Sequence, residues 1–239
     1  MKYDVIVIGA GPGGIFSAYE LVQKNPDLKI AVFEAGHALD KRHCPIDGDK
    51  VKSCIGCKSC SIMSGFGGAG AFSDGKYNIT NDFGGTLYEY IGKKQSLELM
   101  KYVDEINMRY GGEGTKLYST AGTRFKTVCI QNDLHLLDAS VRHLGTDINY
   151  VVLGNLYAYL KDKVEFFFDT PVNSVVAEAA ATRLSVRMHP IHVRIASYRL
   201  DEAEANGWRR FAMIWRFQRN QIVWILVCAW SFQQLYLRI

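Results

Sequence analysis

YDVIVIGAGPGG, at residues 3–14, is the stretch that decides the fold. Its first half, residues 3–8, is an apolar run rich in β-branched side chains, which is typical of a strand buried on both faces of a parallel sheet. The run passes directly into residues 9–14, which are rich in glycine. Glycine permits backbone conformations and close approaches that a side chain would prevent. The stretch therefore predicts a buried strand followed by a tight turn.

A helix and a second strand complete this unit. The residues after Gly14 can form a helix, and small Ala18 lies one helical turn further on. A second apolar strand, residues 28–34, then ends at Glu34. A strand, a glycine turn, a helix and an acid-ended strand, in that order, are the parts of a dinucleotide-binding βαβ unit. We therefore predict an α/β fold with a Rossmann-like nucleotide-binding domain.

Each part of the glycine turn has a role in binding a dinucleotide. Gly9 would allow the tight turn, Gly11 would let the backbone approach a pyrophosphate, and Gly14 would let the helix pack close to the sheet. The start of the helix favours an anion, because its N–H groups are unpaired and its dipole is positive there. A carboxylate at Glu34 would accept hydrogen bonds from ribose hydroxyls. The predicted cofactor-binding residues of this unit are Gly9, Ala10, Gly11, Pro12, Gly13, Gly14 and Glu34.

The position of this unit favours FAD over NAD as the cofactor. The fingerprint lies at the extreme N-terminus, and Glu34 is followed by Ala35, Gly36 and a long excursion, an arrangement that suits flavoproteins. The acid also disfavours NADP at this site, because it would repel a 2′-phosphate. NAD(P)H stays open as an electron partner of the flavin.

The composition argues against several other classes of function. The formal net charge is +4 and the basic residues are scattered, so nothing indicates a nucleic-acid partner. The longest apolar run, residues 222–230, is nine residues long, whereas a membrane span needs about twenty. Six cysteines without a secretory signal favour a reducing, cytoplasmic location. We therefore expect a small-molecule partner in the cytoplasm.

Cysteines cluster in the excursion after Glu34. Cys54, Cys57 and Cys60 have C-x2-C-x2-C spacing, and Cys44 precedes them. Thiols at this spacing can point into one small volume, so four thiolates could hold an iron–sulfur cluster or zinc. The alternatives are a thiol redox or substrate role and a loop of ordinary thiols. The candidate metal ligands are Cys44, Cys54, Cys57 and Cys60.

A second glycine-rich segment, SGFGGAGAFSDGK at residues 64–76, follows the cysteines. Small residues expose consecutive backbone N–H groups, which can bind anions. Such a loop near the first fingerprint could line the pyrophosphate, the ribityl chain or the isoalloxazine of FAD. The alternative is a plain flexible loop. The candidate cofactor-binding residues of this segment are Gly67, Gly68, Ala69, Gly70 and Ser73.

Together, GAGPGG, the cysteine triplet and SGFGGAGAFSDGK resemble the largely uncharacterised FAD-dependent dehydrogenases of bacteria and archaea, relatives of the glutathione-reductase-like flavoproteins. RHLGTD, residues 142–147, fits the same family. The resemblance covers roughly residues 1–178. It implies an FAD-binding domain of glutathione-reductase type, with a cysteine- and glycine-rich excursion at 35–80 and a helical insertion at 84–145. The implied activity is electron transfer between the flavin and a small-molecule redox substrate or electron carrier.

The resemblance also implies where the adenine lies. In such flavoproteins a later strand brings backbone groups to the adenine, and residues 164–168 followed by residues 170–176 match that strand. We expect the adenine contact at Val172. The catalytic residues remain unknown, because substrate-contacting parts of such proteins usually come from a second domain and from the C-terminal segment.

Two helices are expected between these landmarks. Residues 96–110 are amphipathic and are followed by a glycine pair, and Thr146 can cap a second helix that runs to about Lys161. His143 is interpreted as a structural histidine, because no acid–base partner can be placed beside it. The side chains expected to face the core are Leu97, Met100, Val103 and Ile106 in the first helix and Ile148, Val151, Val152, Leu156 and Leu160 in the second.

The chain changes character after about Ala179. Residues 155–239 contain a single glycine, and all four tryptophans lie in the last 32 positions. The periods of strand and helix also disappear. This pattern resembles a reading-frame error, because the segments that start at Leu200 and Asn220 can be read in a shifted frame as family-like sequence. We expect residues 179–239 to be an aberrant, non-native tail; the alternative is a divergent, genuine C-terminal domain.

The sequence as a whole predicts an incomplete FAD-binding α/β domain at residues 1–178 with oxidoreductase activity, of the dehydrogenase kind, toward an unknown substrate. The alternative is a non-catalytic nucleotide- or metal-binding fragment, or an inactive truncated gene product. In both cases the fingerprint turn and the second glycine-rich segment are the parts that would contact a nucleotide.

Overall fold

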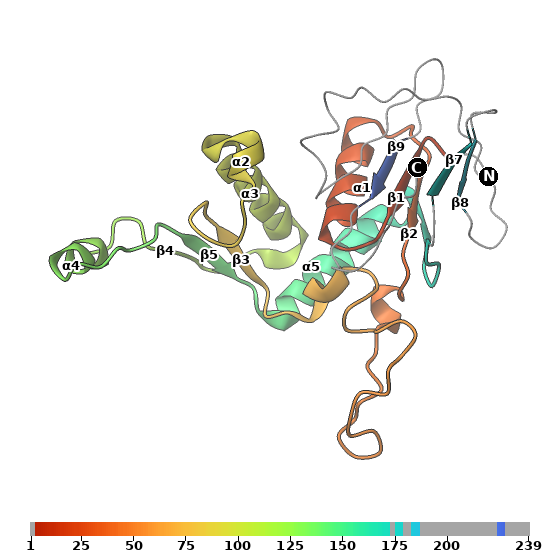
Figure 1. Cartoon of the computed structure of the whole chain (residues 1–239), viewed down its shortest axis with the longest axis horizontal. Helices are drawn as coiled ribbons and strands as arrows, with labels where there is room; N and C mark the ends of the chain where they lie inside the picture. Colours follow the sequence, from red (N-terminus) through yellow and green to blue (C-terminus); the bar gives the residue numbers. More distant parts are fainter. Residues whose placement is uncertain (1–2, 173–174, 179–182, 187–223, 228–239) are drawn as a thin grey trace. The chain divides into compact units, whose positions relative to one another are not determined.

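The structure, a computed structural model of the chain, describes residues 3–172, 175–178, 183–186 and 224–227. The chain divides into two compact units. The first unit comprises Met1–Gly70 and Leu156–Ile239, and the second comprises Ala71–Asn155. The first unit contains a four-stranded and a two-stranded sheet, and the second contains a three-stranded sheet; most of their strands are labelled in Figure 1.

A four-stranded parallel sheet organises the first unit (Figure 1). The side chains of its two central strands are buried apart from the half-buried Ile8, which explains why both strands are continuous apolar runs. The α/β fold and the buried parallel sheet predicted from the sequence are confirmed. The order is β6-β2-β1-β9, and the strands are β1 (Val5–Ile8), β2 (Ile30–Phe33), β6 (Val164–Phe167) and β9 (Trp224–Val227).

The helix α1 (Pro12–Lys24) connects β1 to β2. Proline suits the first helical position, because the N–H that it lacks would have no partner there. The buried apolar side chains of α1 recur at i, i+3, i+4 and i+7, the spacing of a helix with one face against a sheet. These side chains are Ile15, Ala18, Tyr19 and Val22.

Aromatic rings join the sheet to the rest of the first unit. Phe33 on β2 stacks on Phe167 on β6, with ring centroids 4.7 Å apart. The fully buried Phe66, from the second glycine-rich segment, packs edge-on against Tyr157 at 5.0 Å. Tyr157 lies on α5 (Gly145–Leu160), the helix that passes from the second unit into the first. Phe66 therefore anchors the glycine-rich segment in the core.

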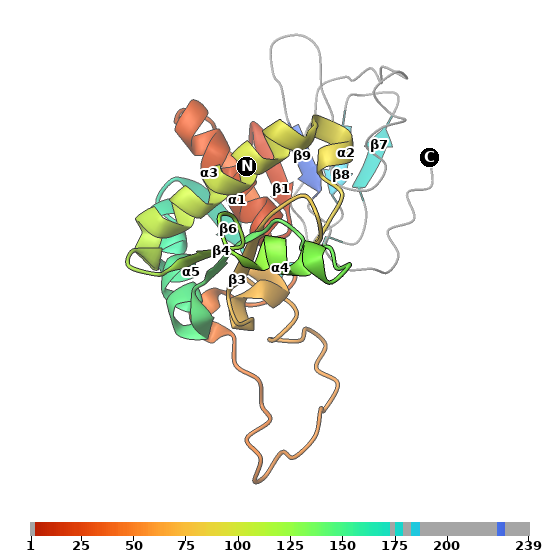
Figure 2. The same cartoon turned by 90° about the vertical axis from the view of Figure 1, so that its left-hand side faces the viewer.

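A long loop extends away from the sheet of the first unit (Figures 1 and 2). It follows the short 3₁₀-helix η1 (Leu39–Lys41) and covers residues 43–60, which contain the four candidate metal ligands. Most of its side chains are exposed. The chain then returns through residues 61–67 to a second 3₁₀-helix, η2 (Gly68–Phe72).

The second unit is built on an antiparallel sheet with the order β3-β5-β4. In its interior the guanidinium of Arg142 forms a bidentate ion pair with Asp104, at 2.6 and 2.8 Å. The insertion predicted to be helical therefore also contributes strands. The elements are β3 (Lys76–Ile79), α2 (Tyr88–Ile91), α3 (Lys93–Asn107), the π-helical turn η3 (Met108–Gly112), β4 (Leu117–Ser119), α4 (Phe125–Gln131) and β5 (Ser140–His143).

The two predicted helices correspond to α3 and α5. Gly111, at the predicted stop of the first helix, has a φ of 126°, which ends the helical geometry there. One expected core residue is wrong: Val151 is 49% exposed. Asn149, two residues earlier, is buried instead and accepts a hydrogen bond from the hydroxyl of Tyr77 at 2.7 Å. The other expected core residues of both helices are buried or half-buried.

The predicted tail, residues 179–239, lies outside the described residues except for two short strands. β8 (Arg183–Val186) pairs antiparallel with β7 (Val175–Glu178), and β9 runs parallel to β1, with Trp224 opposite Val5. The interpretation of the tail as out of frame is not tested by these strands and stays a prediction. Within the described part of the chain, no helix is both long enough and apolar enough to cross a membrane.

Candidate nucleotide-binding site

The fingerprint turn lies between the end of β1 and the start of α1. Gly9 has a φ of 95°, in the region that favours glycine, and its N–H donates to the carbonyl of Phe33 at 2.7 Å. Gly11 is the N-cap of α1, and no described side chain caps the helix. The N–H groups of Gly13 and Gly14, in the first turn, have no helical partner. Together with the helix dipole they favour an anion at this point.

The fingerprint glycines differ in the space around them. A Cβ atom on Gly14 would lie 1.9 Å from the carbonyl oxygen of Gly9, so the turn and the helix can pack this closely only at a glycine. A Cβ atom on Gly11 would have the Cα of Gly68 as its nearest neighbour, at 4.0 Å. A Cβ atom on Gly11 would therefore make an ordinary van der Waals contact with Gly68, without a clash. The close packing at Gly14 agrees with its predicted role, and the role of Gly11 in ligand approach stays a prediction.

The carboxylate of Glu34 joins the fingerprint turn to the second glycine-rich segment. Glu34 is 6% exposed, and its Oε2 accepts a hydrogen bond from the N–H of Ala10 at 2.6 Å. Its Oε1 accepts from the N–H groups of Gly36 and Gly65, at 2.8 and 2.9 Å. A carboxylate has about four acceptor positions, so one is left for a ribose hydroxyl. The ribose contact stays a prediction, and the sequence did not reveal the three backbone contacts.

The second glycine-rich segment lies against the first. The N–H of Gly67 donates to the carbonyl of Ala10 at 2.8 Å. A Cβ atom on Gly68 would lie 3.2 Å from the Cα of Gly11, and Gly68 has a φ of 58°. Both the contact and the backbone conformation therefore favour glycine at this position. The two segments meet beside the carboxyl ends of β1 and β2, where parallel α/β sheets bind ligands.

The remaining candidates of this segment divide between the two units. Ala69 is exposed and Gly70 is half-buried, both at the end of the first unit. Ser73 belongs to the second unit, where its hydroxyl accepts a hydrogen bond from the N–H of Gly75 at 3.3 Å. His143 is also in the second unit, at the end of β5, and its side chain is exposed rather than buried in the core.

The segment that was expected to reach the adenine runs beside Glu34. The N–H of Thr170 donates to the carbonyl of Glu34 at 2.9 Å, and the N–H of Asp169 donates to the carbonyl of Gly36 at 3.0 Å. Val172 follows two residues later and is half-buried. The adenine contact at Val172 stays a prediction, but the chain next to it lies beside the predicted ribose ligand.

Arg42 is a residue of the site region that sequence reasoning missed. It is 5% exposed, and its guanidinium donates hydrogen bonds to four backbone carbonyls. No spacing rule marks this position, because its partners are backbone atoms more than fifteen residues away. The bonds are Nε to Ser61 at 2.9 Å, Nη2 to Ile62 at 2.8 Å, and Nη1 to Phe66 and Gly68 at 2.6 and 2.8 Å.

The structure does not gather the candidate metal ligands into a site. Cys54 and Cys57 are exposed, whereas Cys44 and Cys60 are half-buried. Within the part of the chain that the structure describes, no group of three or more cysteine, histidine or acidic side chains could hold a metal ion. The metal-site prediction is therefore unsupported. The physical reason is that the spacing lies on an exposed loop whose backbone does not turn the thiols toward one another.

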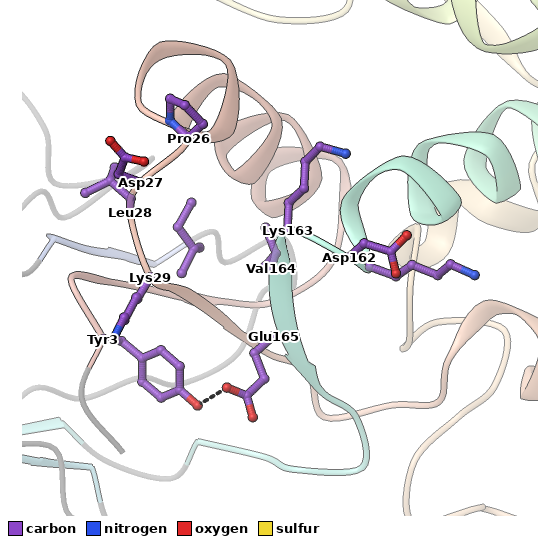
Figure 3. A pocket seen from close by; sticks show the side chains of 11 residues that line it. Tyr3, Pro26, Asp27, Leu28, Lys29, Asp162, Lys163, Val164 and Glu165 are labelled. Carbon is purple, nitrogen blue, oxygen red and sulfur yellow. Dashed lines mark hydrogen bonds between the residues drawn. The ribbon is translucent and has the colours of Figure 1, made fainter.

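The hollow in Figure 3 lies at the amino ends of the strands, opposite the candidate site. It has a volume of about 690 Å³ and is lined by residues before or at the starts of β1, β2 and β6. Within it the hydroxyl of Tyr3 donates a hydrogen bond to the carboxylate of Glu165 (Figure 3). Burial, with the neighbouring carboxylate, raises the pKa of Tyr3 well above its usual range. Because ligands of parallel α/β sheets bind at the carboxyl ends of the strands, this hollow is not part of the candidate site.

Comparisons with known sequences match the fingerprint region. The model of the Thi4 family matches residues 1–40. A thiamine thiazole synthase from Phaeosphaeria nodorum is 60% identical over 35 residues, which are 15% of this chain and 11% of that protein. An uncharacterized protein from Clostridium beijerinckii is 39% identical over 76 residues, which are 32% of this chain and 14% of that protein. The chain therefore matches only a small part of the length of these relatives.

Solved structures show a weaker likeness over more of the chain. Glycine oxidase from Geobacillus kaustophilus is 16% identical, with a TM-score of 0.38, over 77% of this chain and 51% of that one. L-α-glycerophosphate oxidase from Mycoplasma pneumoniae, with FAD bound, is 15% identical, with a TM-score of 0.41, over 81% of this chain and 53% of that one. The present chain spans about half the length of each of these proteins.

Proposed function

We propose that the first unit binds FAD and that the protein is an FAD-dependent oxidoreductase of the dehydrogenase kind. One observation carries the proposal: two glycine-rich segments, 9–14 and 65–70, meet at the start of α1 and share the carboxylate of Glu34. This arrangement offers a diphosphate the backbone N–H groups of two segments that carry few side chains. The local match of residues 1–40 to the Thi4 family supports the same region as the functional one.

The residues of the site fit the parts of FAD. Gly11, Gly13 and Gly14 would take the diphosphate, because their backbone is open or unpaired at the positive end of α1. The acceptor position left on Glu34 would take a ribose hydroxyl, and the segment around Val172 would line the adenine. When bound, FAD supplies the electron-transfer chemistry, while the protein binds and orients it. The partner would be a small-molecule redox substrate or electron carrier, NAD(P)H included, in the cytoplasm.

A titration with FAD tests this proposal. Gly11→Val puts a side chain where the diphosphate is predicted to approach, and the Cβ atom itself would meet no clash, so we expect it to abolish FAD binding without unfolding the protein. Gly154→Val is the matched control, because a Cβ atom there has no atom within 4 Å beyond its chain neighbours and the backbone of its own helix, and it lies outside the fingerprint. Quenching of flavin fluorescence reports binding. Tight binding of NAD without affinity for FAD would overturn the choice of cofactor.

The alternative is a non-catalytic nucleotide-binding protein or an inactive truncated product, which would keep the same site. Turnover separates it from an oxidoreductase. An oxidoreductase should let NADH or NADPH bleach the visible absorption of the bound flavin, and an added electron acceptor should restore it. Bound FAD that no reductant of this class bleaches would favour the non-catalytic alternative.

We also propose that residues 179–239 are translated out of frame. The support is compositional: the tail has a single glycine and all the tryptophans, and arginines interrupt its apolar segments. A buried, unpaired arginine costs several kcal/mol, so such a segment cannot form an ordinary core. Sequencing the gene around the codons for residues 176–184 tests this proposal. An unbroken frame there, with a protease-resistant tail, would restore the divergent C-terminal domain.

A further inference from the structure

Arg42 fixes the direction of two peptide groups in the second glycine-rich segment. In a trans peptide group the C=O and the N–H point in opposite directions. Nη1 of Arg42 holds the carbonyl of Phe66 at 2.6 Å, and the N–H of the same peptide group, which belongs to Gly67, donates to Ala10 at 2.8 Å. This peptide group therefore connects Arg42 to the fingerprint turn.

Arg42 holds the peptide group between Gly68 and Ala69 in the same way, but the N–H of this group does not donate to the fingerprint turn. Nη1 of Arg42 also holds the carbonyl of Gly68, at 2.8 Å, so the N–H of Ala69 points away from the guanidinium. Ala69 is exposed and lies in the first turn of η2, where a backbone N–H has no acceptor within the helix. Gly68 itself contacts Gly11. The unpaired N–H thus lies next to the turn that faces the predicted diphosphate.

We propose that Arg42 is a positioning residue that presents the N–H of Ala69 to the diphosphate of the bound dinucleotide. The inference rests on the proposed function, because it assumes a dinucleotide on the fingerprint turn. Arg42 acts through the backbone and does not touch the ligand. A guanidinium suits this task, since its planar fork of five donors can hold several carbonyls in fixed directions, which an ammonium group cannot do.

The competing role for Arg42 is purely structural. Its bonds to Ser61 and Ile62 also close the base of the exposed loop, so removing it could loosen the chain without any link to a ligand. The two roles differ in one measurable respect. If Arg42 acts through the N–H of Ala69, the loss of ligand affinity in the double variant is smaller than the sum of the losses in the two single variants.

A double-variant cycle on the full chain tests this coupling. Arg42→Met removes the donors, Ala69→Pro removes the N–H, and the third protein carries both changes. Lys41→Met controls for the lost charge, because Lys41 is the exposed neighbour of Arg42 in sequence. Ala69→Gly controls for the side chain, because it keeps the N–H. The dissociation constants for FAD and for ADP are measured for every protein, and thermal unfolding shows which proteins are folded.

Each single change should weaken the binding of both FAD and ADP about 10- to 100-fold, the range for one hydrogen bond to a charged group. The double variant should bind no more weakly than the weaker of the two single variants. Both controls should bind like the parent protein. Should Arg42→Met fail to fold, Arg42→Lys replaces it in the cycle, with a smaller expected loss because the ammonium keeps some of the donors.

Different results separate this inference from the proposed function. Normal FAD binding by a folded Arg42→Met, or additive losses in the double variant, would overturn the role of Arg42 and leave FAD binding intact. A parent protein that binds ADP but not FAD, with the same coupling, would support Arg42 and reject the flavin. A parent protein that binds neither FAD nor ADP would reject both.

Discussion

The fingerprint turn and the cysteine loop are both clear patterns of spacing, yet the structure treats them differently. In the turn, residues 9–14, the N–H of Gly9 bonds to Phe33, Gly14 packs against Gly9, and Glu34 accepts the N–H of Ala10 in a buried position. In the loop, residues 43–60, Cys54 and Cys57 are exposed and no metal-binding group forms among the described residues. A spacing therefore indicates a site most reliably where the surrounding fold determines the position of each residue in the pattern.

The two regions differ because their backbones are stabilised in different ways. The turn is bound to the edge of a buried sheet, where any unpaired N–H or C=O is costly and the chain has few conformations to choose from. The loop makes hydrogen bonds mainly with itself, such as those from the N–H groups of Asp49 and Val51 to the carboxylate of Asp47. These bonds lower the pKa of Asp47, but they do not gather the thiols.

The largest effect should come from Gly14, the most tightly packed glycine of the turn. Gly14→Ala puts a Cβ atom 1.9 Å from the carbonyl oxygen of Gly9, so β1 and α1 must separate. We expect the free energy of unfolding to fall by about 3 kcal/mol, at the upper end of overpacking effects. Urea unfolding followed by circular dichroism measures this loss.

Gly11→Ala is the matched control for this prediction, because the added Cβ atom would stay 4.0 Å from the nearest atom outside its own neighbours. Its free energy of unfolding should change by less than about 1 kcal/mol. Equal losses at Gly14 and Gly11 would contradict the difference in space around these two glycines.

A smaller effect is expected at Glu34, the residue that joins the two glycine-rich segments. Glu34→Gln keeps the shape of the side chain but turns one acceptor oxygen into a donor, so at least one buried N–H among its three partners loses its acceptor. An unsatisfied buried donor costs about 1–3 kcal/mol, so we expect a loss of about 2 kcal/mol in the free energy of unfolding. FAD affinity should fall as well, because the two segments no longer stay together.

Glu20→Gln is the control for Glu34, since Glu20 forms an i,i+4 ion pair with Lys24 at 3.5 Å on the surface of α1. Its free energy of unfolding should change by no more than about 0.5 kcal/mol. A stable Glu34→Gln protein would mean that the three N–H groups find other acceptors, and the comparison between turn and loop would lose its main support.

Local patterns were sufficient to predict the α/β fold and the βαβ unit, but not the contact between the two glycine-rich segments. Apolar runs, glycine positions and the acid after the second strand are properties of neighbouring residues, so they can be read from the chain. The partners of Arg42, the burial of Asn149 and the three bonds of Glu34 could not be predicted. Each depends on which backbone atoms distant segments bring together, and a residue type does not encode this.

Shortening the exposed loop should have a small effect. Replacing residues 45–59 by a short Gly-Ser linker leaves Arg42 and its carbonyl partners at Ser61 and Ile62 in place. Loop length contributes to stability only logarithmically, so we expect the free energy of unfolding to change by less than about 1 kcal/mol. FAD affinity should be unchanged in a fluorescence titration. A large loss of affinity would show that the loop has a role at the nucleotide site that its exposure does not indicate.

The smallest effect is expected from the thiols themselves. Serine at positions 54, 57 and 60 should leave both stability and FAD affinity unchanged, because Cys54 and Cys57 are exposed and Cys60 is half-buried. In the unmodified protein, iodoacetamide should label Cys54 and Cys57 faster than Cys44 and Cys60, with peptide mass spectrometry as the measurement, since reactivity follows exposure. Anaerobically purified protein that contains iron or zinc, with all four thiols protected from labelling, would contradict this prediction. The loop would then rearrange around a metal, and its spacing would indicate a site as reliably as that of the fingerprint turn.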